Sequence, residues 1–117
     1  MRIVARGTLV GFTRFRVQRA ERELFKRHID SWYAVVRRAQ WTNSAELKQQ
    51  LRSASIVSAR RVVFNIKGND YRLVAEINFQ FQILFVKWLG THKEYDKIDV
   101  LSVEYDKERY ADPPDSK

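Results

Sequence analysis

The spacing of hydrophobic residues changes near residue 61, and the two spacings predict two kinds of structure. Before this point, five hydrophobic side chains recur at intervals of three and four residues, which places them on one face of an α-helix. They are Phe25, Ile29, Trp32, Val36 and Ala39. We therefore predict a long helix that ends near Trp41. The segment from Leu9 to Arg19 is either a separate preceding helix or the first turns of this one.

A shorter helix is predicted from the sequence TNSAELKQQL. Asn43 is a good helix-capping residue, and Glu46 is placed three positions later, where it can complete a capping box. Leu47 and Leu51 give this helix a hydrophobic side. The next sequence, SASIVSA, has little helical signal and is predicted to be a connector.

From Arg61 onward, hydrophobic and polar residues alternate, which is typical of β-strands with one buried face. The sequences RRVVFNIK and YRLVAEIN are separated by GND, whose Gly and Asn tolerate the positive φ angles of a tight turn. We predict a β-hairpin whose inner face packs on the helices. This inner face consists of Val62, Phe64, Ile66, Tyr71, Leu73, Ala75 and Ile77.

The sequence ILFVKWLG, which ends at Gly90, is hydrophobic except for Lys87 and predicts a strand buried on most of both faces. Helices followed by a run of strands are typical of an α+β domain. We therefore predict N-terminal helices packed on a C-terminal antiparallel sheet. The 117 residues include 3 Trp, 5 Tyr and 7 Phe, enough for one domain (1–117) with a hydrophobic core. The polar residues from about 104 are predicted to form a flexible tail.

The outer face of the predicted hairpin carries cations that could bind a phosphate group. Its polar positions include Arg61, Asn65, Lys67 and Arg72, and Lys87 of the next strand is a further candidate for this face. Arginine can bind a phosphate through two parallel hydrogen bonds, and lysine acts as a point charge. The same alternation also fits a solvated face that binds nothing.

The positive charge is concentrated in the first half of the chain, whose net charge is +8 overall. Residues 1–61 contain 14 Lys and Arg against 4 Asp and Glu, whereas residues 62–117 contain 8 against 10. A basic surplus favours a polyanionic partner through attraction and counterion release, although it also fits a merely soluble basic protein. Cations in the second half are therefore individually placed residues.

Several classes of protein are disfavoured by what the sequence lacks. There is no Cys, which excludes disulfides and thiolate zinc sites and is compatible with a cytoplasmic location. No hydrophobic run approaches the roughly 20 residues of a membrane span. With 2 His and no HExxH motif, we predict no metal and no cofactor. A glycine-rich phosphate loop and a GxSxG motif are also absent, so neither a nucleotide-binding loop nor a serine hydrolase is supported.

The sequence GTHKEYDKI places several titratable groups directly after the third strand. Gly90 ends the strand and Thr91 is placed to cap a short helical turn. His92, Tyr95 and Asp96 then share one side of that turn, because they stand at positions i, i+3 and i+4. Histidine suits proton transfer near neutral pH. An inert, solvated turn is the competing interpretation.

An RNA-cleaving site needs no metal, because RNA supplies its own nucleophile, the 2′-hydroxyl. The protein has to provide a base for that proton, an acid for the 5′-oxygen and cations for the crowded phosphate. Residues of these types are His92, Lys93, Tyr95, Asp96, Lys67 and Arg72. Residue types alone leave the division of roles among them open.

Two blocks of this sequence, VVFNIKGNDYRLVAEINF and ILFVKWLGTHKEYDKID, resemble the HigB family of type II toxins. These toxins are mRNA interferases of the RelE/ParE-like superfamily. SWYAVVRRAQW and SAELKQQ also resemble the helical half of that family, so the resemblance covers roughly residues 29–100. Residues 1–28 fit the family pattern less well, and no function is carried over to the residues after 101.

The resemblance implies a RelE-like toxin fold and an endoribonuclease that cleaves mRNA on the translating ribosome. A HigA-type antitoxin with a helix-turn-helix domain would hold it inactive. The family's functional positions correspond here to Lys67, Asn69, Arg72, His92, Lys93, Tyr95 and Asp96. Among these we expect His92 to transfer a proton, Lys67, Arg72 and Lys87 to bind phosphate, and Tyr95 and Asp96 to position or assist.

Two alternatives of other classes remain. The chain could be a non-catalytic RNA- or ribosome-binding module, or a ParE-like toxin that inhibits a protein target without cutting RNA. The clustered titratable groups of GTHKEYD favour the nuclease, because a pure binding module does not need them.

Overall fold

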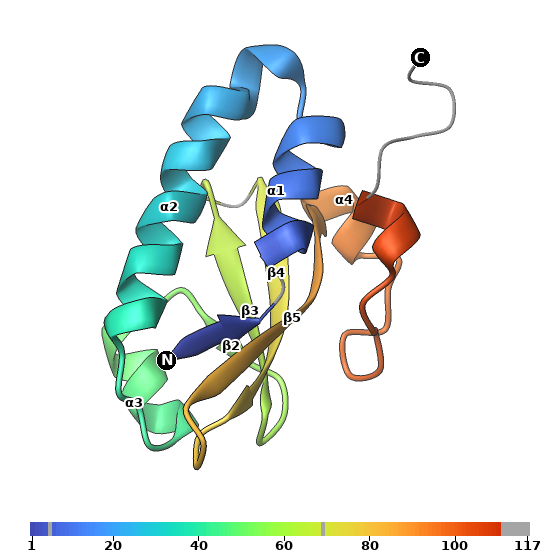
Figure 1. Ribbon diagram of the computed structural model, residues 1–117. Coiled ribbons are helices and arrows are strands. Elements are labelled where there is room, and N and C mark those ends of the chain that lie inside the picture. Colours follow the sequence, from blue (N-terminus) through green and yellow to red (C-terminus); the bar gives the residue numbers. More distant parts are fainter. Residues whose placement is uncertain (5, 69, 111–117) are drawn as a thin grey trace.

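The computed structural model describes residues 1–4, 6–68 and 70–110, and it combines four α-helices and two 3-10 turns with a five-stranded sheet (Figure 1). The helical elements are α1 (Arg6–Phe15), η1 (Arg19–Glu21), α2 (Arg22–Arg38), α3 (Ser44–Gln50), α4 (His92–Tyr95) and η2 (Lys107–Tyr110). The strands are β1 (Arg2–Val4), β2 (Ser55–Ile56), β3 (Arg61–Ile66), β4 (Tyr71–Asn78) and β5 (Ile83–Thr91). No described helix is both long and hydrophobic enough to cross a membrane.

The sheet has the order β1-β5-β4-β3-β2 and confirms an α+β fold. The β3–β4 hairpin and the β4–β5 pair are antiparallel, as predicted. The edge strand β1 was not predicted: it comes from the N-terminus and lies parallel to β5, so that the sheet is mixed. The predicted connector also contributes a two-residue strand, β2, which pairs with β3. Both edge strands are too short to show an alternating pattern in the sequence.

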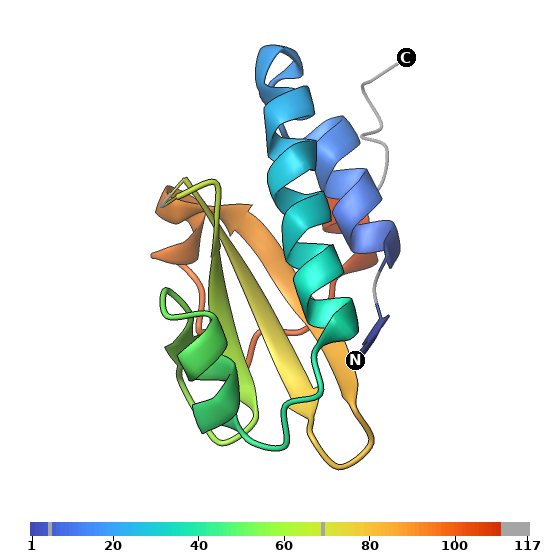
Figure 2. The same cartoon turned by 90° about the vertical axis from the view of Figure 1, so that its left-hand side faces the viewer.

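Helices α1 and α2 cover one face of the sheet (Figure 2). Phe25, Ile29, Trp32 and Val36 of α2 are buried there, which confirms the predicted helical stripe. The separate preceding helix proposed for the segment from Leu9 to Arg19 is confirmed as α1, which begins earlier, at Arg6, and ends at Phe15. The predicted inner face of the hairpin lies in the same core. Tyr71 of this face packs against Phe12 and Phe25, and the three rings meet at centroid distances of 4.6–5.8 Å.

Of the two capping-box hydrogen bonds predicted for α3, one forms and the other has a different partner. The Asn43 side chain accepts a hydrogen bond from the Glu46 amide, but Glu46 reaches back to Thr42 rather than to Asn43. Leu47 is fully buried on the inner side of this helix, as predicted, and Leu51 is partly buried.

The opposite face of the sheet is covered by the chain that follows α4. Val63, Val74 and Trp88 form a second buried cluster, against which Tyr95, Ile98, Val100 and Val103 pack. The outer face of the hairpin is therefore not the solvated surface that alternation alone would allow. Its hydrophobic positions require a cover, and the residues just beyond α4 provide it.

Residues 104–110 pack on the domain, in contrast to the flexible tail predicted from about 104. Tyr110 is only 4% exposed, and its hydroxyl accepts a hydrogen bond from the buried amide of Leu89 at 2.9 Å. A Cβ atom at Gly11 would collide with the carbonyl group of Tyr110, so α1 approaches η2 closely because residue 11 has no side chain. The mostly polar composition of this segment gave no sign that Tyr110 anchors it. The rest of the predicted tail, residues 111–117, lies outside the described residues.

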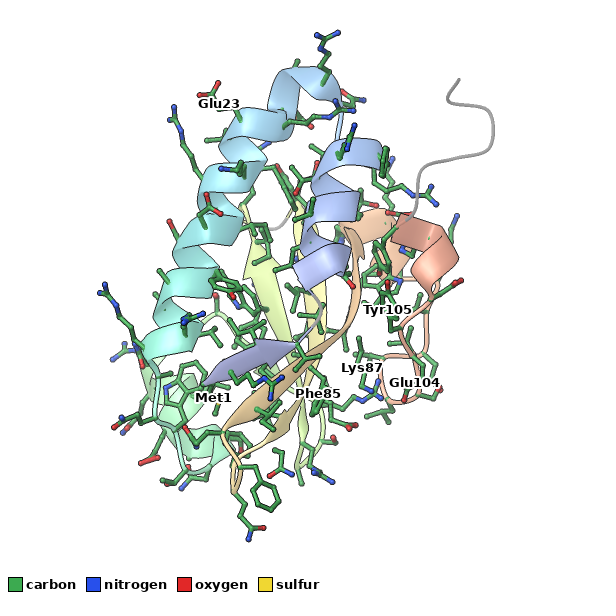
Figure 3. All side chains as sticks on the ribbon, in the orientation of Figure 1. Met1, Glu23, Phe85, Lys87, Glu104 and Tyr105 are labelled. Carbon is green, nitrogen blue, oxygen red and sulfur yellow. The ribbon has the colours of Figure 1, made fainter. Side chains whose placement is uncertain are left out.

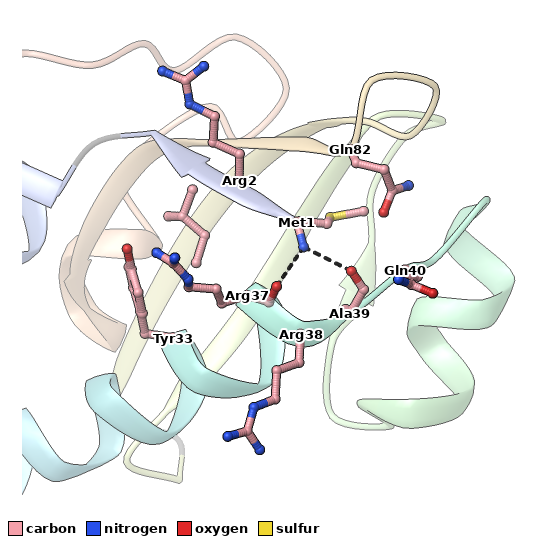
Figure 4. Close-up of a pocket in the computed structure, with 9 residues that line it drawn as sticks. Met1, Arg2, Tyr33, Arg37, Arg38, Ala39, Gln40 and Gln82 are labelled. Atoms are coloured by element: carbon pink, nitrogen blue, oxygen red, sulfur yellow. Dashed lines mark hydrogen bonds between the residues drawn. The ribbon is translucent and has the colours of Figure 1, made fainter.

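The end of α2 is tied to β1 through the amine of Met1 (Figure 4). This group donates hydrogen bonds to the carbonyl oxygens of Val36, Arg37 and Ala39 at 3.1, 2.9 and 2.8 Å. Carbonyl groups at a helix C-terminus lack intrahelical partners, and these contacts satisfy them. A hollow of about 580 Å3 borders this junction, on the helical side of the molecule.

Candidate functional site

The turn from β5 into α4 is built by three local interactions. Thr91 caps α4: its hydroxyl accepts the Glu94 amide proton, and the Glu94 carboxylate accepts the amide proton of Thr91 in return. The first amide of the helix, that of His92, donates to the carbonyl oxygen of Asp70 at 3.0 Å. The helix is thereby fixed beside the β3–β4 turn, and the predicted cap at Thr91 is confirmed.

His92, Tyr95 and Asp96 lie on this turn at the predicted helical spacing. The His92 Nε2 atom is 3.9 Å from Asp96 Oδ2, and the two side chains are 53% and 64% exposed. Tyr95 is partly buried, with its ring 6.2 Å from that of Trp88. Lys93 is exposed on the same helix. His92, Lys93 and Asp96 are thus open to solvent and Tyr95 is partly so, within reach of a large ligand such as RNA.

Arg72 joins this group from the neighbouring strand. It stands directly opposite Gly90 in the β4–β5 ladder. Its guanidinium carbon lies 5.9 Å from the centre of the Tyr95 ring, within the range of a cation–π contact. The structure therefore brings together Arg72, Tyr95, His92 and Asp96, which were singled out separately in the sequence.

Lys67 lies in the β3–β4 turn with a φ of +53°, a left-handed conformation. Its ammonium group is 3.3 Å from Glu21 Oε1 and 3.5 Å from Asp70 Oδ2. Burial acts to lower the pKa of Lys67, but the two carboxylates outweigh it and raise the pKa above the ordinary lysine value. The prediction that Lys67 shares the outer face with Arg72 is thus wrong: the turn directs it toward η1, on the helical side.

Arg61 and Lys87 both bind the carboxylate of Glu104 in the same chain instead of pointing freely into solvent. Arg61 is only 5% exposed and contacts both Glu76 (3.2 Å) and Glu104 (3.0 Å). It also donates to the carbonyl oxygens of Val100 and Val103. Lys87 Nζ lies 2.8 Å from Oε2 of Glu104. Figure 3 shows the two side chains next to each other.

These contacts separate Arg61 from the α4 site. Arg61 pairs with Glu76 and Asn65 with Arg72, four steps apart along the hairpin. At about 3.4 Å per residue, that is about 14 Å. Arg61 and Lys87 therefore fasten the covering segment. That they bind RNA phosphate stays a prediction, and the phosphate would have to compete with Glu104. Their alternation with hydrophobic residues gave no sign of the partner, Glu104.

Arg109, which lies beside the site, had no signal in the sequence. Arg109 Nη2 is 3.1 Å from Glu94 Oε2, and the guanidinium carbon lies 4.9 Å from the Trp88 ring centre. Burial raises the pKa of Glu94, but hydrogen bonds from Thr91 and the charge of Arg109 outweigh it, so the net pKa is below the ordinary value. Glu94 and Arg109 are 15 positions apart and meet only in the folded chain.

Two further points concern the predicted turn residue Asn69 and possible metal ligands. Asn69, the predicted turn residue, lies outside the described residues. Within the described ranges, no group of three or more His, Cys, Asp or Glu side chains is arranged to hold a metal ion.

Helices on one face of the sheet and a titratable turn at the end of its third long strand define a small α+β domain. A family model described as the RelE-like toxic component of a toxin–antitoxin system, the HigB toxin family, matches residues 25–98. The chain belongs to this family. The matched residues include the β3–β4 hairpin, β5 and α4.

Individual relatives match over shorter stretches. The mRNA interferase toxin HigB of Escherichia coli (strain K12) is 43% identical over 37 residues, 32% of this chain and 36% of that protein. The mRNA interferase HigB of Escherichia coli O6:H1 is 29% identical over 72 residues, 60% of this chain and 70% of that protein. The alignment with the first relative thus spans about a third of its length.

Proposed function

We propose that this chain is an endoribonuclease toxin that cleaves mRNA at the α4 site. The observation that carries the proposal is the convergence of Arg72 with His92, Tyr95 and Asp96 at the junction of β5 and α4. A cation held beside three groups that can donate, accept or orient protons is what phosphodiester cleavage requires. The names of the relatives, mRNA interferases, agree with this chemistry.

In the proposed reaction the RNA supplies the nucleophile. A base takes the proton of the 2′-hydroxyl, and the oxygen attacks the adjacent phosphorus. The bond from phosphorus to the 5′-oxygen then breaks, and an acid returns a proton to that oxygen, leaving a 2′,3′-cyclic phosphate and a 5′-hydroxyl. We assign one of the two proton transfers to His92, with Asp96 at 3.9 Å placed to orient the imidazole.

Arg72 is proposed to bind the phosphate on which negative charge accumulates. Its contact with the Tyr95 ring holds the guanidinium at the site, and fixed cations stabilise such charge better than mobile water. Lys67 is the second phosphate ligand in this proposal. Since Glu21 and Asp70 now neighbour its ammonium group, RNA phosphate has to compete with these carboxylates. Lys93, exposed on α4, is proposed to contact the RNA backbone nearby.

The partners follow from the substrate. We propose that the chain acts in the cytoplasm on mRNA held by the ribosome, without a metal or other cofactor. The arginine-rich helical half, including Arg14, Arg16, Arg19, Arg37 and Arg38, would face ribosomal RNA. A HigA-type antitoxin with a helix-turn-helix domain is proposed as the inhibitor.

The proposal is tested by incubating purified chain with mRNA, free and on ribosomes, and comparing wild type with His92→Gln. His28→Gln is the matched control, because His28 is exposed on α2, away from the site. Wild type and His28→Gln should cleave, while His92→Gln should lose activity. If the chain arrests growth but cleaves mRNA neither free nor on ribosomes, the nuclease function is excluded. A non-catalytic RNA-binding module or a ParE-like inhibitor is then favoured.

A further inference from the structure

Arg109 lies outside residues 25–98, which match the family model, yet its side chain reaches the base of α4. Its guanidinium contacts three parts of the site. Nη2 lies 3.1 Å from the Glu94 carboxylate, Nη2 and Nε donate to the carbonyl oxygen of Leu89 at 3.1 and 3.3 Å, and the group stacks on Trp88. With 19% of the side chain exposed, it is largely enclosed by these partners.

Glu94 is the residue through which Arg109 reaches the catalytic turn. It closes the capping box with Thr91 and so determines where α4 begins. A helix of one turn is far too short to be stable by itself. The orientation of His92 and Tyr95 therefore depends on the contacts that hold Glu94, and Arg109 is the cation among them.

The backbone of Arg109 is anchored independently of its side chain. Its carbonyl oxygen accepts a hydrogen bond from Arg16 Nε at 2.8 Å, which joins it to the region just after α1. The next residue, Tyr110, is fixed by its hydrogen bond to Leu89 and its close contact with Gly11. The guanidinium thus projects from a fixed support toward Glu94, which is what a clamp requires.

Gly90 completes this arrangement. A Cβ atom at residue 90 would lie less than 3 Å from the Trp88 ring and from Arg109 Nη2. The ring and the guanidinium therefore occupy the space directly over the strand opposite Arg72. Arg109 and the proposed phosphate-binding residue Arg72 are therefore both neighbours of Gly90.

We propose that Arg109 is a positioning residue, which holds α4 and thereby sets the geometry of His92, Tyr95 and Asp96 relative to Arg72. Its effect on cleavage rests on the proposed function above, whereas its effect on α4 does not. The C-terminal segment, to which the family match assigns nothing, would in this way be part of the functional unit.

The test compares Arg109→Gln and Arg109→Lys with a matched control, Arg52→Gln, which alters an exposed arginine after α3. Hydrogen exchange of the amides of Glu94, Tyr95 and Asp96 is measured on the full free chain, with the β4 and β5 amides as an internal reference. We expect Arg109→Gln to speed exchange in α4 by about tenfold, with little change in the sheet. Arg109→Lys should lie between it and wild type, and Arg52→Gln should match wild type.

Cleavage kinetics provide the second readout. We expect Arg109→Gln to lower kcat by about 10- to 100-fold with KM nearly unchanged, because misplaced groups slow chemistry more than binding. Two results for Arg109→Gln would overturn the proposal. One is an α4 exchange rate equal to that of wild type, and the other is faster α4 exchange with an unaltered kcat.

The design separates this inference from the proposed function. If wild type cleaves no RNA, the proposed function fails, while the exchange data still decide whether Arg109 holds α4. If Arg109→Gln does not fold, Glu94→Gln removes the same ion pair from the other side and keeps an oxygen that can accept from Thr91. Glu94→Gln should then also speed hydrogen exchange of the α4 amides. An exchange rate equal to that of wild type in this variant would contradict the proposed role of Arg109.

Discussion

The guanidinium carbon of Arg72 lies 5.9 Å from the centre of the Tyr95 ring, so a strand residue and a helix residue that are 23 positions apart form one surface. The contact joins the two sequence blocks that carry the family resemblance. If this surface binds the scissile phosphate, both residues should matter for cleavage more than for folding.

Arg72→Gln is expected to lower kcat/KM for RNA cleavage by about 100-fold, since removal of a placed cation leaves the developing charge unstabilised. Arg72→Lys should retain part of the activity, because lysine keeps the charge but not the paired hydrogen bonds. Cleavage assays on ribosome-bound message would measure both effects, with circular dichroism as the folding control. Full activity in Arg72→Gln would remove this residue from the site.

Gly90→Ala is expected to destabilise the chain by about 1–3 kcal/mol, the usual cost of forcing an extra methyl group into a packed position. Its Cβ would displace the Trp88 ring or Arg109. Urea unfolding measures the loss. Gly7→Ala is the control, because a Cβ at Gly7 meets no atom within 4 Å. Equal stability of the two variants would show that the ring and the guanidinium do not lie over residue 90.

Tyr110→Phe is expected to lower the free energy of unfolding by about 1–3 kcal/mol, because the buried Leu89 amide loses its hydrogen-bond acceptor. Tyr105→Phe is the matched control, since Tyr105 is 48% exposed. Thermal unfolding of the Tyr110→Phe and Tyr105→Phe variants measures the difference in stability. No effect of Tyr110→Phe would mean that residues 104–110 behave as the flexible tail predicted from the sequence.

The ion pair between Glu94 and Arg109 should make part of the stability depend on pH. Because the pKa of Glu94 in the folded chain is below its ordinary value of 4.5, its carboxylate stabilises the fold above the unfolded-state pKa. This contribution is lost as the pH falls through the folded pKa. Since the side chain is 41% exposed, water screens the pair, and we expect at most about 1 kcal/mol.

Comparing unfolding of wild type and Glu94→Gln from pH 7 to pH 3 tests this sign. The difference in stability should be largest near neutral pH and should shrink as the pH falls below 4.5 and through the lower pKa of the folded chain. A difference that grows as the pH falls would mean that the Glu94 carboxylate is not stabilised by its surroundings.

Regular periodicity is the reason that much of the fold could be predicted. The stripe on α2 and the alternation in β3 and β4 each bury one face, so the sequence determines both the element and the side that meets the core. The cap at Thr91 was predictable because a capping box involves residues only three positions apart. His92, Tyr95 and Asp96 followed from that same local geometry.

The features that were not predicted depend on contacts distant in the sequence. Arg61 looked like a surface cation until Glu104, 43 positions later, proved to be its partner. The left-handed conformation of Lys67 turned its side chain toward Glu21 on the other side of the sheet. Arg109 has no periodic or motif signal, because its partners come from β5 and α4.

The central claim is that the α4 turn cleaves mRNA, and mapping message 5′ ends after brief induction tests it most directly. Proton-transfer residues commonly contribute about 10²- to 10⁴-fold to rate. We therefore expect new 5′ ends with wild type and His28→Gln, and their loss in a folded His92→Gln variant. Identical sets of new ends in His92→Gln and wild type would contradict the role of His92, and growth arrest by wild type without any new ends would contradict the nuclease itself.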